Sequence, residues 1–271
     1  MVPRQLSKKP RTFALTMVIT FISGANFFSV LLLWPPEAYN VYGHDPVGVG
    51  IRGLPFAFGV FTGCIISLVL LSRFRGSQIQ YLILAASVLM TVGCGCMALA
   101  RRDNINAVYA ILFMAGIGVG GITIPVSTVA TILCRADAIA TVTALTLAVR
   151  LVGGAVGYAV YFNVFVRRLV PELAALLPPV CARVGIADPE VVAQVIRLTA
   201  ASLVSEIRNL PGVDDDMAVW EVLIAAGQQA YANVYPWVYY CSVAFGGVSV
   251  VASLALGDIS DMVDDTVVAL M

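Results

Sequence analysis

Charged residues are scarce in this 271-residue chain. Lysine, arginine, aspartate and glutamate together make up 12% of it, whereas hydrophobic residues make up 60%; soluble domains carry about 25% charged residues. The 16 basic and 16 acidic residues balance, so the net charge gives no reason to expect nucleic acid as a partner. The composition therefore predicts an integral membrane protein, whose first partner is the lipid bilayer.

Motifs for catalysis and for metal binding are also missing. The sequence contains no H-E-x-x-H, G-x-S-x-G or Walker motif, which excludes an ATP-driven pump on this chain and leaves an enzyme unsupported. Two of its six cysteines, Cys94 and Cys96, point to different faces of a helix, and the only histidine, His44, is far from them in sequence. We expect the cysteines to be packing residues, and we expect no metal site and no cofactor.

What the chain does have is long apolar segments. A helix needs about 20 residues to cross the hydrocarbon layer, and only helices or closed barrels satisfy the backbone there. These segments are too long for barrel strands. The sequence predicts an all-α integral membrane fold, a single domain over residues 1–271 with six transmembrane helices, near 12–34, 53–71, 80–100, 107–134, 139–166 and 235–256.

The basic residues of the short loops predict the orientation. Short loops rich in lysine and arginine stay in the cytoplasm. One side of the predicted bundle collects more of them, although Arg101 and Arg102 go against the rule. We therefore expect both termini in the cytoplasm, with a cytoplasmic tail over 257–271 and one long extracytoplasmic loop over 167–234. The basic residues on the cytoplasmic side are Arg4, Lys8, Lys9, Arg11, Arg73, Arg75 and Arg135, against Arg52, Arg101 and Arg102 opposite.

The long loop contains two signals for helix starts. Asp188, Pro189 and Glu190 form an N-cap, an N1 proline and a first-turn acid ahead of apolar residues at helical spacing. The acidic residues 214–216 could begin a second helix that leads into the last span. We expect surface helices that lie on the membrane or cover the outer mouth of the bundle.

Arg150 stands near the middle of an apolar segment, where a charge costs from about 3 to over 10 kcal/mol. Residues three or four positions apart share its helix face, and the segment 12–34 carries a second polar stripe. Either the two stripes line a translocation path where Arg150 attracts acceptor-rich groups, or Arg150 is a buried residue bound to carbonyls and hydroxyls that fixes helix register. The polar residues of these faces are Thr143, Thr146, Arg150 and Tyr161, and Thr16, Thr20, Ser23 and Asn26.

Glycine pairs recur at a spacing of four. The stretch "GIGVGG" over 116–121 matches a dinucleotide-binding fingerprint, but it lies inside an apolar run without the strand and helix start that the fingerprint requires. Small residues four apart instead let membrane helices approach closely, and Pro125 can kink its helix or act as a gating point. The predicted packing and gating residues are Gly59, Gly63, Gly116, Gly120, Pro125, Gly153, Gly154 and Gly157.

Acidic residues avoid the six predicted helices. Glu37, Asp45, Asp103 and Asp137 fall in predicted loops or at helix ends, and the rest lie in the long loop or the tail. A proton-coupled carrier usually keeps an ionisable carboxylate within the membrane. We therefore expect this chain to lack an intramembrane carboxylate.

Three stretches carry a resemblance to a known family. They are "VYGHDPVGVGIRGLPFAFG" over 41–59, "ATVTALTLAVRLVGGAVGYAVYFNVF" over 140–165 and "LALGDISDMVDD" over 254–265. In this order and spacing the chain resembles the C-terminal half of fungal major facilitator superfamily transporters, of the 14-helix drug:proton antiporter type that includes trichothecene efflux pumps and siderophore transporters. Arg150, Gly153, Gly154 and Gly157 match the penultimate helix of that pattern.

The resemblance implies a function. It implies export of small organic molecules, such as toxins, drugs or siderophores, by a proton-coupled carrier of the plasma membrane that rocks one half against the other. The first half, with most proton-handling residues, has no counterpart here, so we expect a fragment or a half-transporter that needs the missing N-terminal half or a partner chain. The alternative is a transport-inactive six-helix protein that associates with or regulates a full-length relative.

Overall fold

The computed structural model describes residues 9–73, 78–134, 138–213 and 216–257, and these residues form helices joined by short connections. No strand occurs among them. Six of the helices are long and apolar enough to cross a membrane, which confirms the six-helix prediction. The elements are α1 (Pro10–Tyr42), α2 (Pro46–Arg73), α3 (Gln78–Cys96), η1 (Met97–Leu99), α4 (Ile105–Ile132), α5 (Ile139–Arg183), α6 (Pro189–Ala200), η3 (Glu206–Asn209) and α7 (Met217–Leu254).

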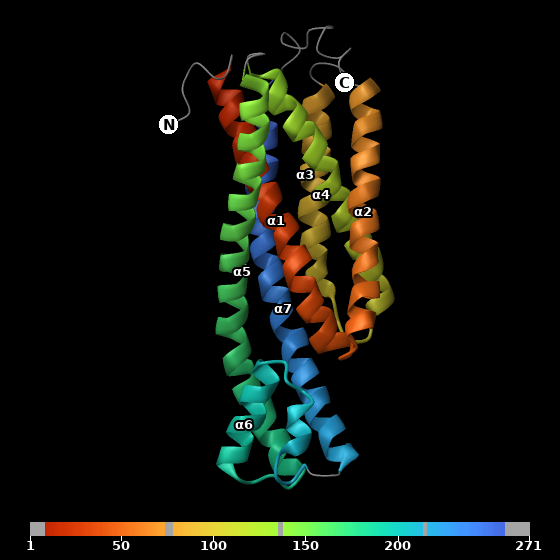
Figure 1. Ribbon diagram of the computed structural model, residues 1–271, viewed down its shortest axis with the longest axis vertical. Helices are drawn as coiled ribbons and strands as arrows, with labels where there is room; N and C mark the ends of the chain where they lie inside the picture. The colour runs from red at the N-terminus through yellow and green to blue at the C-terminus, as the bar shows by residue number, and fades with distance from the viewer. Residues whose placement is uncertain (1–8, 74–77, 135–137, 214–215, 258–271) are drawn as a thin grey trace.

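The six long helices run along the long axis of the molecule, and α6 lies at one end of it (Figure 1). The start of α1 and the end of α7 lie together at the opposite end. The core between the helices is built from aliphatic side chains, small residues and a few buried aromatics. Much of the apolar surface of α2 and α5 stays exposed, as expected for helices that face lipid or another helical bundle.

The helices pair across two groups of three. α1 packs mainly on α5 and α7, whereas α4 packs mainly on α2 and α3, and α3 and α7 join the two groups. In chain order the six long helices form two triplets, α1–α2–α3 and α4–α5–α7. The first helix of each triplet packs on the second and third helices of the other triplet. This exchange is consistent with the paired three-helix repeats that make up each six-helix half of major facilitator transporters.

The predicted loop over 167–234 was wrong at both ends. α5 continues through Arg167 and Arg168 to Arg183, and the last span begins at Met217. At about 1.5 Å per residue, the 45 residues of α5 reach roughly 67 Å, more than twice the hydrocarbon thickness. Residues 167–213 and 216–234, which we call the cap, thus form a helical extension of the bundle (Figure 1).

Both helix starts predicted in the cap are present. The carboxylate of Asp188 accepts a hydrogen bond from the backbone N–H of Glu190 at 2.9 Å at the start of α6. Asp216 caps α7 by accepting from the N–H of Ala218 at 2.9 Å. The apolar core of the bundle continues into the cap, where it includes Leu169, Leu173, Leu177, Cys181, Val191, Val195, Ile207, Leu223 and Tyr231.

The first helix also continues beyond its predicted end. The prediction placed this end at Trp34, where the apolar run stops and Pro35 and Pro36 follow. α1 instead runs through both prolines to Tyr42. A proline removes one intrahelical hydrogen bond without necessarily ending the helix, and the side-chain amide of Asn40 donates to the carbonyl of Pro36 at 2.8 Å in this turn.

Candidate functional site

Arg150 lies where α5 meets α1 and α4. Its Nη2 donates to the backbone carbonyl of Thr123 on α4 at 3.3 Å, and its own backbone packs directly against Gly24 of α1. The Nε atom of Arg150 is buried and has no hydrogen-bond partner among the described residues. The guanidinium is therefore held at a three-helix junction with one N–H donor left unsatisfied.

The polar stripe of α1 faces α5, but it is closely packed. Asn26 is fully buried, and its Oδ1 accepts a hydrogen bond from the hydroxyl of Tyr161 on α5 at 3.1 Å. Ser23 is also buried and donates to the carbonyl of Thr20 in its own helix at 2.8 Å. The Nδ2 of Asn26 has no partner among the described residues. This contact between α1 and α5 thus contains a second unsatisfied donor.

The other two residues proposed for the pathway take different positions. The hydroxyl of Thr146 is buried and donates to the carbonyl of Thr143 at 2.7 Å, whereas Thr143 itself is exposed on the bundle surface. The structure therefore joins Asn26 and Tyr161 directly and places Arg150 between helices, but it does not bring Thr143 to the same contact.

Glycines form the closest helix contacts on both sides of the bundle. A Cβ atom on Gly120 of α4 would lie 2.1 Å from the carbonyl oxygen of Val60, and one on Gly63 of α2 would lie 2.3 Å from that of Ile117. A Cβ on Gly153 of α5 would lie 2.1 Å from the carbonyl oxygen of Phe21. Gly59 and Gly116 face backbone carbonyls as closely, whereas Gly154 faces the ring of Phe28 and Gly157 faces Ala25. These seams therefore leave no room for a side chain.

Pro125 frees a backbone carbonyl that a neighbouring helix then binds. Without a proline N–H, the carbonyl of Gly121 loses its usual partner four residues on. The hydroxyl of Ser67 on α2 donates to this carbonyl at 2.6 Å. The proline break in α4 is thus compensated from α2, next to the Gly63 contact.

Glu37 contradicts the expectation that the acidic residues avoid the six long apolar helices. It lies within α1 with 2% of its surface exposed, and its Oε2 accepts a hydrogen bond from the hydroxyl of Tyr239 on α7. The sequence analysis missed it because the predicted helix ended at Trp34, where the apolar run stops, three residues before Glu37. A usable signal was the spacing of Trp34, Ala38 and Val41, which continues the buried face past the prolines.

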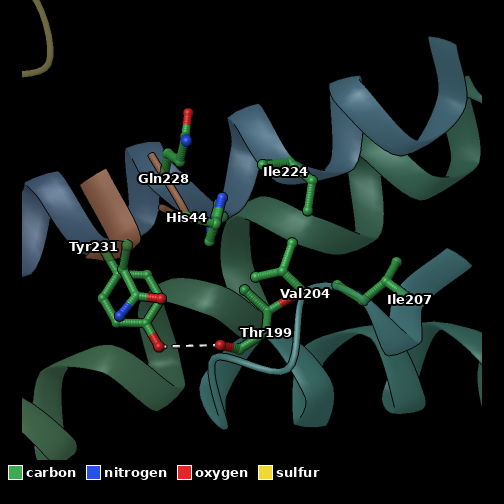
Figure 2. A pocket seen from close by; sticks show the side chains of 9 residues that line it. His44, Thr199, Val204, Ile207, Ile224, Gln228 and Tyr231 are labelled. Carbon is green, nitrogen blue, oxygen red and sulfur yellow. Dashed lines mark hydrogen bonds between the residues drawn. The ribbon is translucent and has the colours of Figure 1, made fainter. Parts of the chain in front are cut away.

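Two cavities lie near the cap. Figure 2 shows the smaller one, of about 10 Å³, between α1, α6 and α7. His44 and Gln228 are among the residues that line it, and the hydroxyl of Tyr231 donates to the carbonyl of Thr199 at 3.0 Å. Burial lowers the pKa of the His44 imidazole below its usual value. This cavity is far smaller than the roughly 300–1,000 Å³ of ligand pockets, so it is a packing feature between the cap and the turn after α1.

The larger cavity, of about 690 Å³, lies where the connection before α4 meets α7. Its volume is in the range of small-molecule pockets. Charged and amide side chains line much of it, including Arg101, Asp103, Gln229 and Asn233, with Pro236 and Tyr240 of α7. It opens at the end of the bundle that carries the cap, so it can admit a small polar or amphipathic molecule.

Comparison with known proteins supplies a family. Residues 1–270 match the sequence profile described as fungal trichothecene efflux pump (TRI12). The trichothecene efflux pump TRI12 of Fusarium sporotrichioides is 23% identical over 270 residues, which cover 98% of this chain but 44% of that protein. The efflux pump aflT of Aspergillus parasiticus is 30% identical over 171 residues, which cover 62% of this chain and 33% of that protein. The chain thus spans less than half the length of either relative.

Proposed function

Because this chain belongs to the fungal trichothecene efflux pump family, we propose that it is one half of a carrier that exports trichothecenes or similar small toxins by proton antiport. It is a multi-pass membrane protein, and we place it in the plasma membrane with both termini in the cytoplasm and the cap outside. The other half is an N-terminal half or a partner chain. The substrate moves as the two halves rock against each other.

The observation that carries this proposal is the unsatisfied guanidinium of Arg150. A charged group at this depth costs several kcal/mol, so it needs a binding partner or a function. Its one interhelical bond, to the carbonyl of Thr123, leaves the buried Nε without a partner among the described residues. An acceptor group of the substrate satisfies this N–H when it reaches the junction of α1, α4 and α5.

The arrangement of the helices supports the proposal that this chain is one half of a two-half carrier. The pairing of α1 with α5 and α7, and of α4 with α2 and α3, makes the six helices a unit of two interlocked repeats. Large apolar side chains on α2, such as Phe58 and Phe61, stay mostly exposed. The polar cavity beside Arg101 and Asn233 opens at the cap end, and we take it as the exit mouth on the outer side.

The experiment is a toxin-efflux assay on Arg150 variants. The chain is expressed in a toxin-sensitive host together with the N-terminal half of TRI12 of Fusarium sporotrichioides. The amount of toxin retained in the cells is then measured. Arg150→Ala removes a charge-assisted hydrogen bond worth about 1.5–3 kcal/mol, so we expect efflux to fall by about 10- to 100-fold, with partial recovery in Arg150→Lys. Arg183→Ala, at the exposed end of α5, is the matched control and should export normally.

Two outcomes would reject parts of this proposal. Unchanged efflux in Arg150→Ala, at equal membrane levels, would remove Arg150 from the pathway. If the unmodified chain reaches the membrane and neither exports toxin nor gives resistance, alone or with a partner half, the regulatory alternative replaces export.

A further inference from the structure

Glu37 is a buried acidic residue at the contact between α1 and α7, and it plays no part in the Arg150 junction. We propose that Glu37 is the proton-binding carboxyl of the carrier, taking up one proton on one side of the membrane and releasing it on the other in each cycle. This inference rests on the proposed proton antiport and assigns it to a residue. The Tyr239 hydroxyl is the positioning group that holds the carboxyl.

The burial of Glu37 sets the first condition for such a site. The side chain is 2% exposed, and Tyr239, which donates to its Oε2, is fully buried. An ionised carboxylate without a cation is strongly disfavoured in a medium of low polarity, whereas a neutral carboxyl with one hydrogen bond is tolerated. The packed arrangement therefore holds the protonated form, and ionisation requires that the site open to water.

No cation neutralises the carboxyl. Among the described residues, Glu37 forms no ion pair, and the nearby arginine of α2, Arg52, directs its Nη1 to the carbonyls of Ala38 and Gly43 at 3.4 Å each. The other titratable groups around the site, among the described residues, include three tyrosines that interact with Glu37 and two groups that interact with those tyrosines. They are Tyr42 on α1, Cys94 on α3, Tyr109 on α4, and Tyr235 and Tyr239 on α7.

A second polar group is available beside the carboxyl. The hydroxyl of Tyr235 is buried and has no hydrogen-bond partner among the described residues. Tyr235 lies one helical turn before Tyr239, on the same face of α7, and interacts electrostatically with Glu37. The site thus has a second O–H donor that can bind the carboxylate once the proton has left.

Prolines interrupt both helices that enclose the site. Pro35 and Pro36 precede Glu37 in α1 and leave the carbonyls of Leu31 and Leu32 without their usual helix donors. Pro236 stands between the two tyrosines of α7. Helices bend most readily at such positions, so the contact between Glu37 and Tyr239 is placed where α1 and α7 can separate.

The proposed step is a simple proton exchange. When the site is open to the more acidic side, the carboxylate of Glu37 binds one proton and becomes a neutral carboxyl, and the helices close over it. When the site opens to the other side, the O–H bond breaks, the proton passes to water and the carboxylate returns. One toxin molecule moves in the opposite direction between these two events.

The first experiment tests the proton site without transport. The purified chain is placed in lipid nanodiscs, and the infrared C=O band of protonated carboxyl groups is followed from acidic to alkaline pH. We expect a band that persists at neutral pH in the unmodified chain and in Glu221→Gln, an exposed acid on α7. The band should be absent in Glu37→Gln and shifted in Tyr239→Phe, which keeps the carboxyl but loses its hydrogen bond.

The second experiment separates this inference from the proposed function. Membrane vesicles carrying the chain with its partner half are tested for toxin movement driven by a proton gradient and for exchange of labelled toxin without a gradient. We expect Glu37→Gln to lose the gradient response and keep exchange. Gradient-driven export that persists in this variant, or an infrared spectrum identical to that of the unmodified chain, overturns the role of Glu37. If the unmodified protein moves no toxin in either test, the proposed function fails, and with it the coupling role, whatever the infrared result.

Discussion

The hydrogen bond from Ser67 to the carbonyl of Gly121 allows a quantitative test of how the break at Pro125 is stabilised. Ser67 is 1% exposed, and its Oγ lies 2.6 Å from the carbonyl oxygen. A buried carbonyl left without a donor costs about 1–3 kcal/mol in soluble proteins, whereas hydrogen bonds between membrane helices average about 0.6 kcal/mol. The membrane values, which average about 0.6 and reach about 1.7 kcal/mol, apply here because the unfolded helices also find partners. Since this hydrogen bond is short and buried, we expect Ser67→Ala to cost about 1 kcal/mol.

A double-mutant cycle isolates this bond. Pro125→Ala restores a backbone N–H that can bind the Gly121 carbonyl within α4, so the Ser67 hydroxyl is no longer required. We expect Ser67→Ala to cost about 1 kcal/mol in the original background and about zero in Pro125→Ala, which gives a coupling energy near 1 kcal/mol. The assay is the free energy of unfolding of the purified chain, measured by detergent titration in mixed micelles.

The control is Ser72→Ala, an exposed residue of α2 whose hydroxyl donates to the Val69 carbonyl of its own helix at 2.7 Å. It should change the free energy of unfolding by less than about 0.5 kcal/mol in both backgrounds. An equal cost of Ser67→Ala with and without Pro125 would refute the reasoning, because the hydroxyl would then act through packing and not through the carbonyl that the proline frees.

Two further predictions concern the glycine seams and the cap. Gly120→Val places its Cβ about 2.1 Å from the backbone carbonyl of Val60, which cannot move aside. We therefore expect loss of the folded protein in the same unfolding assay. Gly247→Val is the matched control and should fold normally, because nothing lies within 4 Å of a Cβ at that position. His44, packed edge-on against Tyr39, has a pKa lowered by burial, so the folded state binds fewer protons than the unfolded state and stability falls as the pH drops below the usual imidazole pKa. The protection of the α6 amides, corrected for the intrinsic pH dependence of hydrogen exchange, should therefore fall at mildly acidic pH. His44→Gln should abolish this pH dependence, and an unchanged dependence would contradict it.

The sequence predicted the elements of the fold better than their lengths. Apolar length is a local property, so hydropathy finds each of the six spans, and Asp188 and Asp216 mark helix starts through their own local chemistry. The ends of α1 and α5 were placed too early because the prediction followed the apolar runs, which stop at Trp34 before two prolines and at Val166 before two arginines. Packing overrides both signals here: the cap buries the extension of α5, and α7 covers the turn after Pro36.

The candidate site was predictable only in part. Helical periodicity placed Tyr161 on the face of Arg150, and the α1 stripe included Asn26, which the structure bonds to Tyr161. The partner of Arg150, a backbone carbonyl of α4, could not be predicted, because any residue type supplies such a carbonyl. Glu37 was missed for a different reason. The prediction ended this helix at Trp34, so Glu37 was assigned to a loop, whereas the structure places it within α1.

The pairing of α1 with α5 and α7 sets an order for the synthesis of this protein. Ribosomes add about 5–20 residues per second, and more than 100 residues separate the end of α1 from the completed α5. α2, α3 and α4 can assemble as they emerge, whereas α1 waits on the order of 10 s for its partners. During that interval its buried polar side chains, from Thr16 to Glu37, have no helix to cover them. We therefore expect the newly synthesised α1 to depend on the insertion machinery, and to be open to membrane quality control, until α5 and α7 emerge.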